Sequence, residues 1–209
     1  MATAVVSFRL EQKHSVPFTL EVDIASGLFD LTAEDFLEKN AVLTVWQGDT
    51  PQRYVSGIVT SVQRGENNGW QMRYWLSINP PLWRAGLRQN FRIFQQQDIR
   101  TISATLLNEA GVADWTPLFY EAHPAREFCV QYGETDLGFL MRLWAEEGLF
   151  FFERCGKQQP DKPEGGRFVY CHSCRRGGYH GAEDKPERRG QCGDTGTDPA
   201  TGGAEGAGR

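Results

Sequence analysis

Residues 70–81 read WQMRYWLSINPP, and this stretch decides the class of fold. Large apolar side chains stand at every second position, namely Trp70, Met72, Tyr74, Leu76 and Ile78. Alternation of this kind places them on one face of a half-buried β-strand. The two prolines that follow lack an amide donor and end the strand. The sequence therefore predicts antiparallel β-structure up to about residue 80.

The chain before this stretch has the same character. Alternating or β-branched runs occupy residues 5–10, 18–24, 42–46 and 54–63. Residues 65–69, rich in Gly and Asn, are typical of a hairpin loop. A short helix is expected over 32–40, with Thr32 as its N-cap and Asp35 as the capping-box partner. Five or more strands with short connections predict a small antiparallel β-barrel domain over residues 1–80.

After residue 80 helices and strands mix, which predicts an α+β domain over 81–153 and a mainly β, α+β fold class overall. Asp98 is the expected N-cap of a helix that buries Ile99, Ile102 and Leu106 and ends at Gly111. Short strands are expected at 92–95, 127–132 and 149–152.

A second helix is expected from Thr135–Asp136 to the stop at Gly148. Its apolar residues at i, i+3, i+4 and i+7 predict a buried face made of Leu137, Leu140, Met141 and Trp144. Glu146 and Glu147 fall in its last turn, where the helix dipole disfavours acids, and Arg142 can offset part of that cost. We interpret the two acids as a solvated or interface helix end. A salt bridge to a neighbouring subunit is the first alternative, and a catalytic acid pair is the weakest.

The last part of the chain differs sharply in composition. Residues 154–209 contain no Leu, Ile, Met or Trp and hold 13 of the 23 glycines. A segment with so few apolar side chains cannot offset its chain entropy. We therefore expect a mostly disordered tail over 154–209, outside the folded body.

No residue is singled out as catalytic, cofactor-binding or metal-binding. The sequence has no nucleophile elbow, P-loop or dinucleotide fingerprint. His14 and His123 have no recognisable nucleophile partner, and Cys129 is expected to be a small packed residue. The pair Cys171-x2-Cys174, with Cys155, His180 and Cys192 around it, has metal-ligand spacing but lacks a matching second pair, so a zinc module is a minor alternative.

Composition also limits the binding partners. The formal net charge of −5 argues against nucleic acid or an anionic membrane, and no apolar run is long enough to span a bilayer. Basic residues do cluster with aromatics, namely Arg84, Arg88, Arg92 and Arg100 with Trp83, Phe91 and Phe94. Such interleaving can bind single strands, but intersubunit ion pairs or plain surface are favoured here. Without a signal sequence, the chain is expected in the cytoplasm.

Several ordered motifs resemble one family. These are residues 81–84 (PLWR), 90–95 (NFRIFQ), 126–136 (REFCVQYGETD) and 139–150 (FLMRLWAEEGLF), with the hairpin at 54–78. Together they resemble the N-terminal hub region of VgrG, the spike protein of bacterial type VI secretion, which is related to phage tail hubs. The resemblance covers about residues 4–153.

The resemblance implies a structural role without catalysis. It implies a homotrimer with pseudo-sixfold symmetry that caps the secretion tube, contacts an Hcp-like tube protein and effectors, and leaves the cell by type VI secretion. A prophage tail hub is the alternative within this class. The resemblance fades after Phe152, where the family continues with more hub barrel, an OB-like domain and a needle. We therefore expect a truncated hub, with a non-functional remnant as one interpretation. We also expect a frameshifted tail, which reading the DNA in the other two frames would test.

Overall fold

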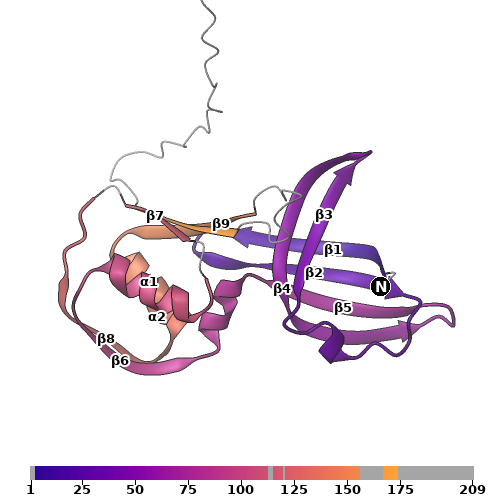
Figure 1. Ribbon diagram of the computed structural model, residues 1–209, viewed down its shortest axis with the longest axis horizontal. Helices are drawn as coiled ribbons and strands as arrows, with labels where there is room; N and C mark the ends of the chain where they lie inside the picture. The colour runs from indigo at the N-terminus through magenta and orange to yellow at the C-terminus, as the bar shows by residue number, and fades with distance from the viewer. Residues whose placement is uncertain (1–2, 113–114, 120, 156–166, 174–209) are drawn as a thin grey trace, which may run out of the picture. The chain divides into compact units, whose positions relative to one another are not determined.

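The computed structural model describes residues 3–112, 115–119, 121–155 and 167–173. The first part of the chain forms a five-stranded antiparallel sheet in the order β1-β2-β5-β4-β3. Its strands are β1 (Thr3–Lys13), β2 (Val16–Ser26), β3 (Asn40–Gln47), β4 (Thr50–Asn67) and β5 (Met72–Asn79). Figure 1 shows that the sheet curls into an open half-barrel, with β1 and β3 at its edges. The predicted antiparallel β-architecture of this part is confirmed.

The alternation that predicted β5 also sets its register. Met72, Tyr74, Leu76 and Ile78 are buried on one face. Leu76 pairs with Val22 on β2 and with Val62 on β4. Together with apolar side chains of β2 and β4 they form one core cluster. Trp70 precedes the strand and is 84 % exposed, because it lies in the hairpin turn outside the sheet.

The helix expected over 32–40 is much shorter. It is a single 3-10 turn, η1 (Ala33–Asp35), and β3 already begins at Asn40. The expected cap interaction is present, since the Asp35 carboxylate accepts hydrogen bonds from the amide and hydroxyl of Thr32, at 2.8 and 3.0 Å. The chain then turns into the sheet, where the Glu38 amide donates to the Val59 carbonyl.

The second part mixes helices and strands. In chain order it contains η2 (Pro81–Gly86), β6 (Gln89–Gln97), α1 (Ile99–Glu109), β7 (Trp115–Leu118), β8 (Arg126–Thr135), α2 (Asp136–Glu146), β9 (Leu149–Cys155) and β10 (Arg167–Ser173). β6 and β8 form a two-stranded antiparallel ribbon, and β7, β10 and β9 form a three-stranded sheet. Figure 1 shows α1 and α2 between this ribbon and the β7–β9 strands.

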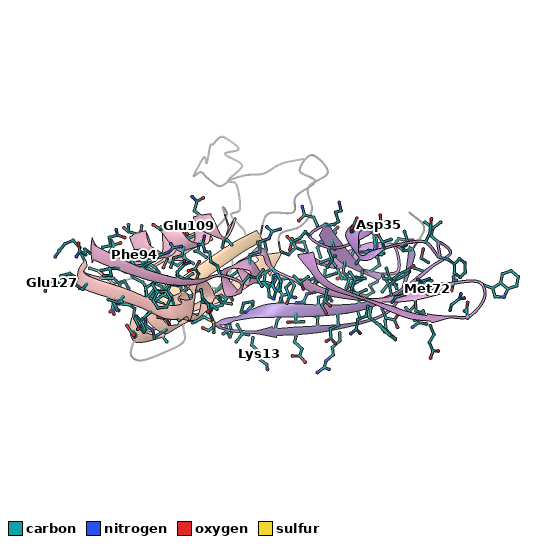
Figure 2. All side chains as sticks on the ribbon, turned by 90° about the horizontal axis from the view of Figure 1, so that it is seen from below. Lys13, Asp35, Met72, Phe94, Glu109 and Glu127 are labelled. Carbon is teal, nitrogen blue, oxygen red and sulfur yellow. The ribbon has the colours of Figure 1, made fainter. Side chains whose placement is uncertain are left out.

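A second core cluster fills the space around the two helices. Side chains of β6, α1, β8, α2 and β9 contribute to it, with Ile99, Ile102 and Leu106 on α1 as predicted. Asp98 caps α1 by accepting a hydrogen bond from the Thr101 amide at 2.7 Å. Figure 2 separates the two parts: Asp35 and Met72 lie with the first sheet, and Phe94, Glu109 and Glu127 with the second part. A domain boundary at residue 80 stays a prediction.

The predicted buried face of α2 is partly wrong. Leu140 and Trp144 are buried as expected, but Phe139 and Leu143 complete the buried face. Leu137 and Met141 are only partly buried at its margin. The face is rotated because Phe139 stacks on Phe94 of β6, with ring centroids 5.7 Å apart. Thr135 caps the helix and Gly148, at a φ of 68°, follows its end as predicted.

The structure extends beyond the expected end of the folded body. β9 continues to Cys155, and β10 pairs with β9 and, in parallel, with β7. Residues 167–173 are therefore a strand, where the sequence predicted disorder. The remaining tail residues lie outside the part of the chain that the structure describes. Their predicted disorder therefore stays a prediction. Within the described ranges, no helix has the length and apolar character that a membrane crossing requires.

Gly57 on β4 lies where the sheet leaves no room for a side chain. A Cβ at this position would overlap the Ile78 side chain and come within 2.9 Å of the Asn79 carbonyl oxygen. Gly57→Ala is therefore expected to lower the free energy of unfolding by about 1–3 kcal/mol. Urea denaturation checks this, with Gly27→Ala as the control, because a Cβ at Gly27 meets nothing within 4 Å. Equal stability of the two variants would contradict the packing at Gly57.

Candidate assembly surface

The β6–β8 ribbon has two different faces. Cross-strand pairs set its register: Phe91 lies opposite Tyr132, Ile93 opposite Val130, and Gln95 opposite Phe128. Since side chains alternate along a strand, the residues between them point the other way. Phe94, Cys129 and Gln131 are buried on that inner side. One face of the ribbon thus closes the second core cluster, and the other is turned away from it.

The face turned away from the core is apolar and uncovered. We call it the outer ribbon face and define it by Phe91, Ile93, Phe128, Val130 and Tyr132. Their side chains are between 47 and 80 % exposed. Phe91 and Tyr132 meet edge to face, with ring centroids 5.1 Å apart. The sixth outward position of these pairs is Gln95, so the face carries no charge. Contiguous exposed patches of this kind mark interaction sites.

A buried polar network holds the ribbon to α2 from behind. Asp136 is buried at the first turn of α2, and its carboxylate accepts three side-chain hydrogen bonds. The donors are Gln131 at 2.8 Å, Asn90 at 2.9 Å and Arg88 at 2.7 Å. Burial raises the pKa of Asp136, but these donors outweigh it and hold the pKa below its usual value. The network therefore fixes both strands of the ribbon to the helix.

The predicted basic and aromatic cluster is not a free basic surface. Arg88, just before β6, and Arg92 on β6 both pair with Glu109 at the end of α1. Arg84 pairs with Glu38. Arg100 lies over the Phe119 ring, 5.4 Å from its centroid. The sequence favoured ion pairs between subunits or plain surface, but the pairs of Arg84, Arg88 and Arg92 form within the chain.

The remaining aromatics of that cluster are divided between core and surface. Phe94 is in the core, and Figure 2 labels it on β6. Phe91 instead belongs to the outer ribbon face. Trp83 is half-buried in η2. The residues of the predicted cluster are therefore divided between the core, the outer ribbon face and ion pairs within the chain.

Glu146 and Glu147 are also paired within the chain. Arg126 donates to Glu146 at 2.9 Å and to Glu147 at 2.6 Å. Arg142 donates to Glu146 at 2.9 Å, as the sequence predicted. His123 Nδ1 lies 2.7 Å from Glu147 Oε2. The two acids thus end the helix inside an ion-pair network within the chain, and the Glu146 side chain stays 43 % exposed.

The network also argues against an acid pair in catalysis. Hydrogen bonding from Arg126 lowers the pKa of Glu146. Burial raises the pKa of Glu147, but Arg126 and His123 lower it more, so the net shift is downward. A general acid near neutral pH needs a raised pKa, and both shifts run in the opposite direction.

Other candidate side chains have structural surroundings. Cys129 is buried, and burial raises the pKa of its thiol, which opposes the thiolate that a nucleophile needs. His14 packs edge-on against Phe150 at 5.6 Å. Among the described side chains, no group of three or more His, Cys, Asp or Glu is placed to hold a metal. The Cys171-x2-Cys174 alternative lies outside the described side chains.

An exposed apolar face on a mainly β fold is typical of proteins that assemble with others, and comparison with known proteins identifies the family. Residues 12–188 match the family model described as phage tail baseplate hub (GPD). The chain therefore belongs to this family, and the match runs beyond the boundary near residue 153 that the sequence motifs predicted.

Curated relatives agree with the predicted resemblance to VgrG. The type VI secretion system spike protein VgrG3 of Vibrio cholerae is 42 % identical over 134 residues, covering 64 % of this chain and 13 % of the relative. The spike protein VgrG2b of Pseudomonas aeruginosa is 37 % identical over 154 residues, covering 74 % of this chain and 15 % of the relative. The chain is thus a VgrG-like N-terminal region, and its matches span about one seventh of these relatives.

A solved structure supports the fold. The E. coli c3393 protein, described as a type VI secretion component similar to the T4 phage tail proteins gp27 and gp5, aligns with a TM-score of 0.71. The alignment covers 84 % of this chain and 50 % of that one, at 19 % identity. The mainly β, α+β, phage tail hub-like fold predicted from the sequence is confirmed.

Proposed function

We propose that this chain is the hub region of a type VI secretion spike, a structural part that assembles as a homotrimer at the end of a secretion tube. Its partners would be further copies of itself, an Hcp-like tube protein and effectors carried by the spike, and it would leave the cell with them. No side chain needs a catalytic role in this proposal.

The observation that carries the proposal is the outer ribbon face on a chain of this family. A face of five large, exposed and uncharged side chains fits a protein that works by permanent association. The buried network at Asp136 supports the same role, because it holds that face rigid on α2. The curated relatives described above are spike proteins, which favours the spike over the prophage tail hub.

Size-exclusion chromatography with light scattering on the full chain tests the proposal. A mass near three times 23.6 kDa is expected. A monodisperse monomer across the concentration range would contradict assembly through this region. A stable dimer would contradict the three-fold hub and point to a self-complementary contact instead.

A further inference from the structure

We infer that, within the proposed trimer, the outer ribbon face of one copy packs against the β1 edge of the next copy. This inference rests on the proposed function and names the two surfaces that meet. The β1 edge is defined here by Val5, Val6 and Phe8. These three side chains are each about half exposed on a strand that pairs with a neighbour on one side only.

The size of the outer ribbon face suits a subunit contact. A fully exposed aromatic side chain presents roughly 200 Å². At their exposed fractions, Phe91, Phe128 and Tyr132 leave about 400 Å² of aromatic surface uncovered. Ile93 and Val130 add to this area. A standard interface buries about 800 Å² on each partner, with an apolar centre and a polar rim. The outer ribbon face can supply the apolar centre of an interface. Gln95, which lies opposite Phe128, is a polar residue at its margin.

The chemistry of the face selects an apolar protein partner. Its outward positions carry no charge to attract nucleic acid or an anionic lipid surface. The cations that flank it, Arg88 and Arg92, are already paired with Glu109. A second copy of the chain offers Val5, Val6 and Phe8 at its β1 edge, each about half exposed. The exposed charges that follow them on β1, Arg9 and Glu11, pair with each other.

Three-fold closure requires two different surfaces. A patch that meets its own copy gives a two-fold dimer, whereas a ring of three needs a head-to-tail contact repeated by rotation. The outer ribbon face lies on β6 and β8, and the β1 edge lies on the first sheet. Each copy therefore carries both halves of one contact, which a closed ring requires together with a rotation of one third of a turn between copies.

Three variants of the full chain test the contact by analytical ultracentrifugation over a concentration series. The face variant is Phe91→Ser with Tyr132→Ser, and the edge variant is Val6→Ser with Phe8→Ser. Trp70→Ser is the matched control, because Trp70 is even more exposed but lies on the hairpin turn. Thermal melting of each variant verifies that it is folded.

We expect the face and edge variants each to weaken self-association at least about 30-fold, the size expected of a hot-spot loss. The control should stay trimeric. An equimolar mixture of face and edge variants should form a dimer, since one intact contact remains between an unaltered edge and an unaltered face.

The other outcomes separate this inference from the proposed function. A trimer that survives in the face variant overturns the inference and leaves the hub proposal standing. A mixture that stays monomeric, when both variants alone are monomeric, overturns the head-to-tail pairing. A monomeric wild-type chain overturns the inference and the proposed assembly together.

Discussion

Replacing Trp144 with alanine is expected to lower the free energy of unfolding by about 3–5 kcal/mol. Trp144 is 2 % exposed on α2 and packs on Phe151 of β9, with ring centroids 5.1 Å apart. Its indole nitrogen donates to the Ser103 hydroxyl of α1 at 2.8 Å. The substitution therefore leaves a cavity between three elements and a buried hydroxyl without its donor.

Urea denaturation of wild type and variant gives the difference directly. Trp70→Ala is the control, because an exposed tryptophan outside the core should change stability by less than about 0.5 kcal/mol. Trp144→Phe keeps much of the ring volume but loses the hydrogen bond to Ser103, so its loss should be intermediate. A Trp144→Ala loss below about 1 kcal/mol would mean that the core around α2 is packed differently.

The sequence was sufficient to predict an element where its local pattern allows only one arrangement. The alternation around Tyr74 fixes which side of β5 is buried, because a one-residue shift would turn polar side chains into the core. Asp98 and Gly111 bound α1 through a cap and a positive φ, both of which depend on nearby residues alone. Such elements could be predicted without knowledge of their neighbours.

Helix α2 shows where local signals fail. It carries apolar side chains on most of its circumference, so helical spacing alone permits several buried faces. The partner decides between them. Phe139 is buried because Phe94 of β6 stacks on it, and Met141 is left at the margin. That contact joins residues far apart in the sequence, and no local pattern contains it.

The candidate surface was missed for a related reason. In the strand predicted at 127–132, successive side chains alternate, so Phe128, Val130 and Tyr132 share one face. The usual expectation buries the apolar set. In the structure the buried set contains Gln131, because its side chain donates to Asp136 at 2.8 Å and to the Glu134 carbonyl at 3.1 Å. A buried glutamine of this kind could have signalled that the strand is turned outward.

Asp136→Ala is expected to destabilise the protein by about 3–5 kcal/mol. Removing the carboxylate leaves Arg88, Asn90 and Gln131 without their common acceptor at a buried site. The loss arises mainly from these unpaired donors rather than from the removed side chain itself. Denaturant unfolding near neutral pH measures it, with Asp35→Ala as the control. Asp35 also accepts hydrogen bonds at a helix start, but it is exposed, so its loss should be about 1 kcal/mol.

The pH dependence of the free energy of unfolding shows whether Asp136 stabilises the fold through its charge or through its shape. The folded-state pKa of Asp136 is lowered, so its stabilising contribution is complete well above the unfolded pKa of about 3.9 and is lost as the pH falls through the folded value. The stability difference between wild type and Asp136→Ala should therefore be largest above about pH 5 and shrink in stronger acid. Asp136→Asn, which keeps the shape without the charge, should lose stability near neutral pH and show a flatter dependence. A difference between wild type and Asp136→Ala that instead grows as the pH falls from 7 towards 4 would mean that the carboxyl is protonated in the folded protein. The ribbon would then be held by shape alone, and the outer ribbon face would lack the rigid backing that assembly through it requires.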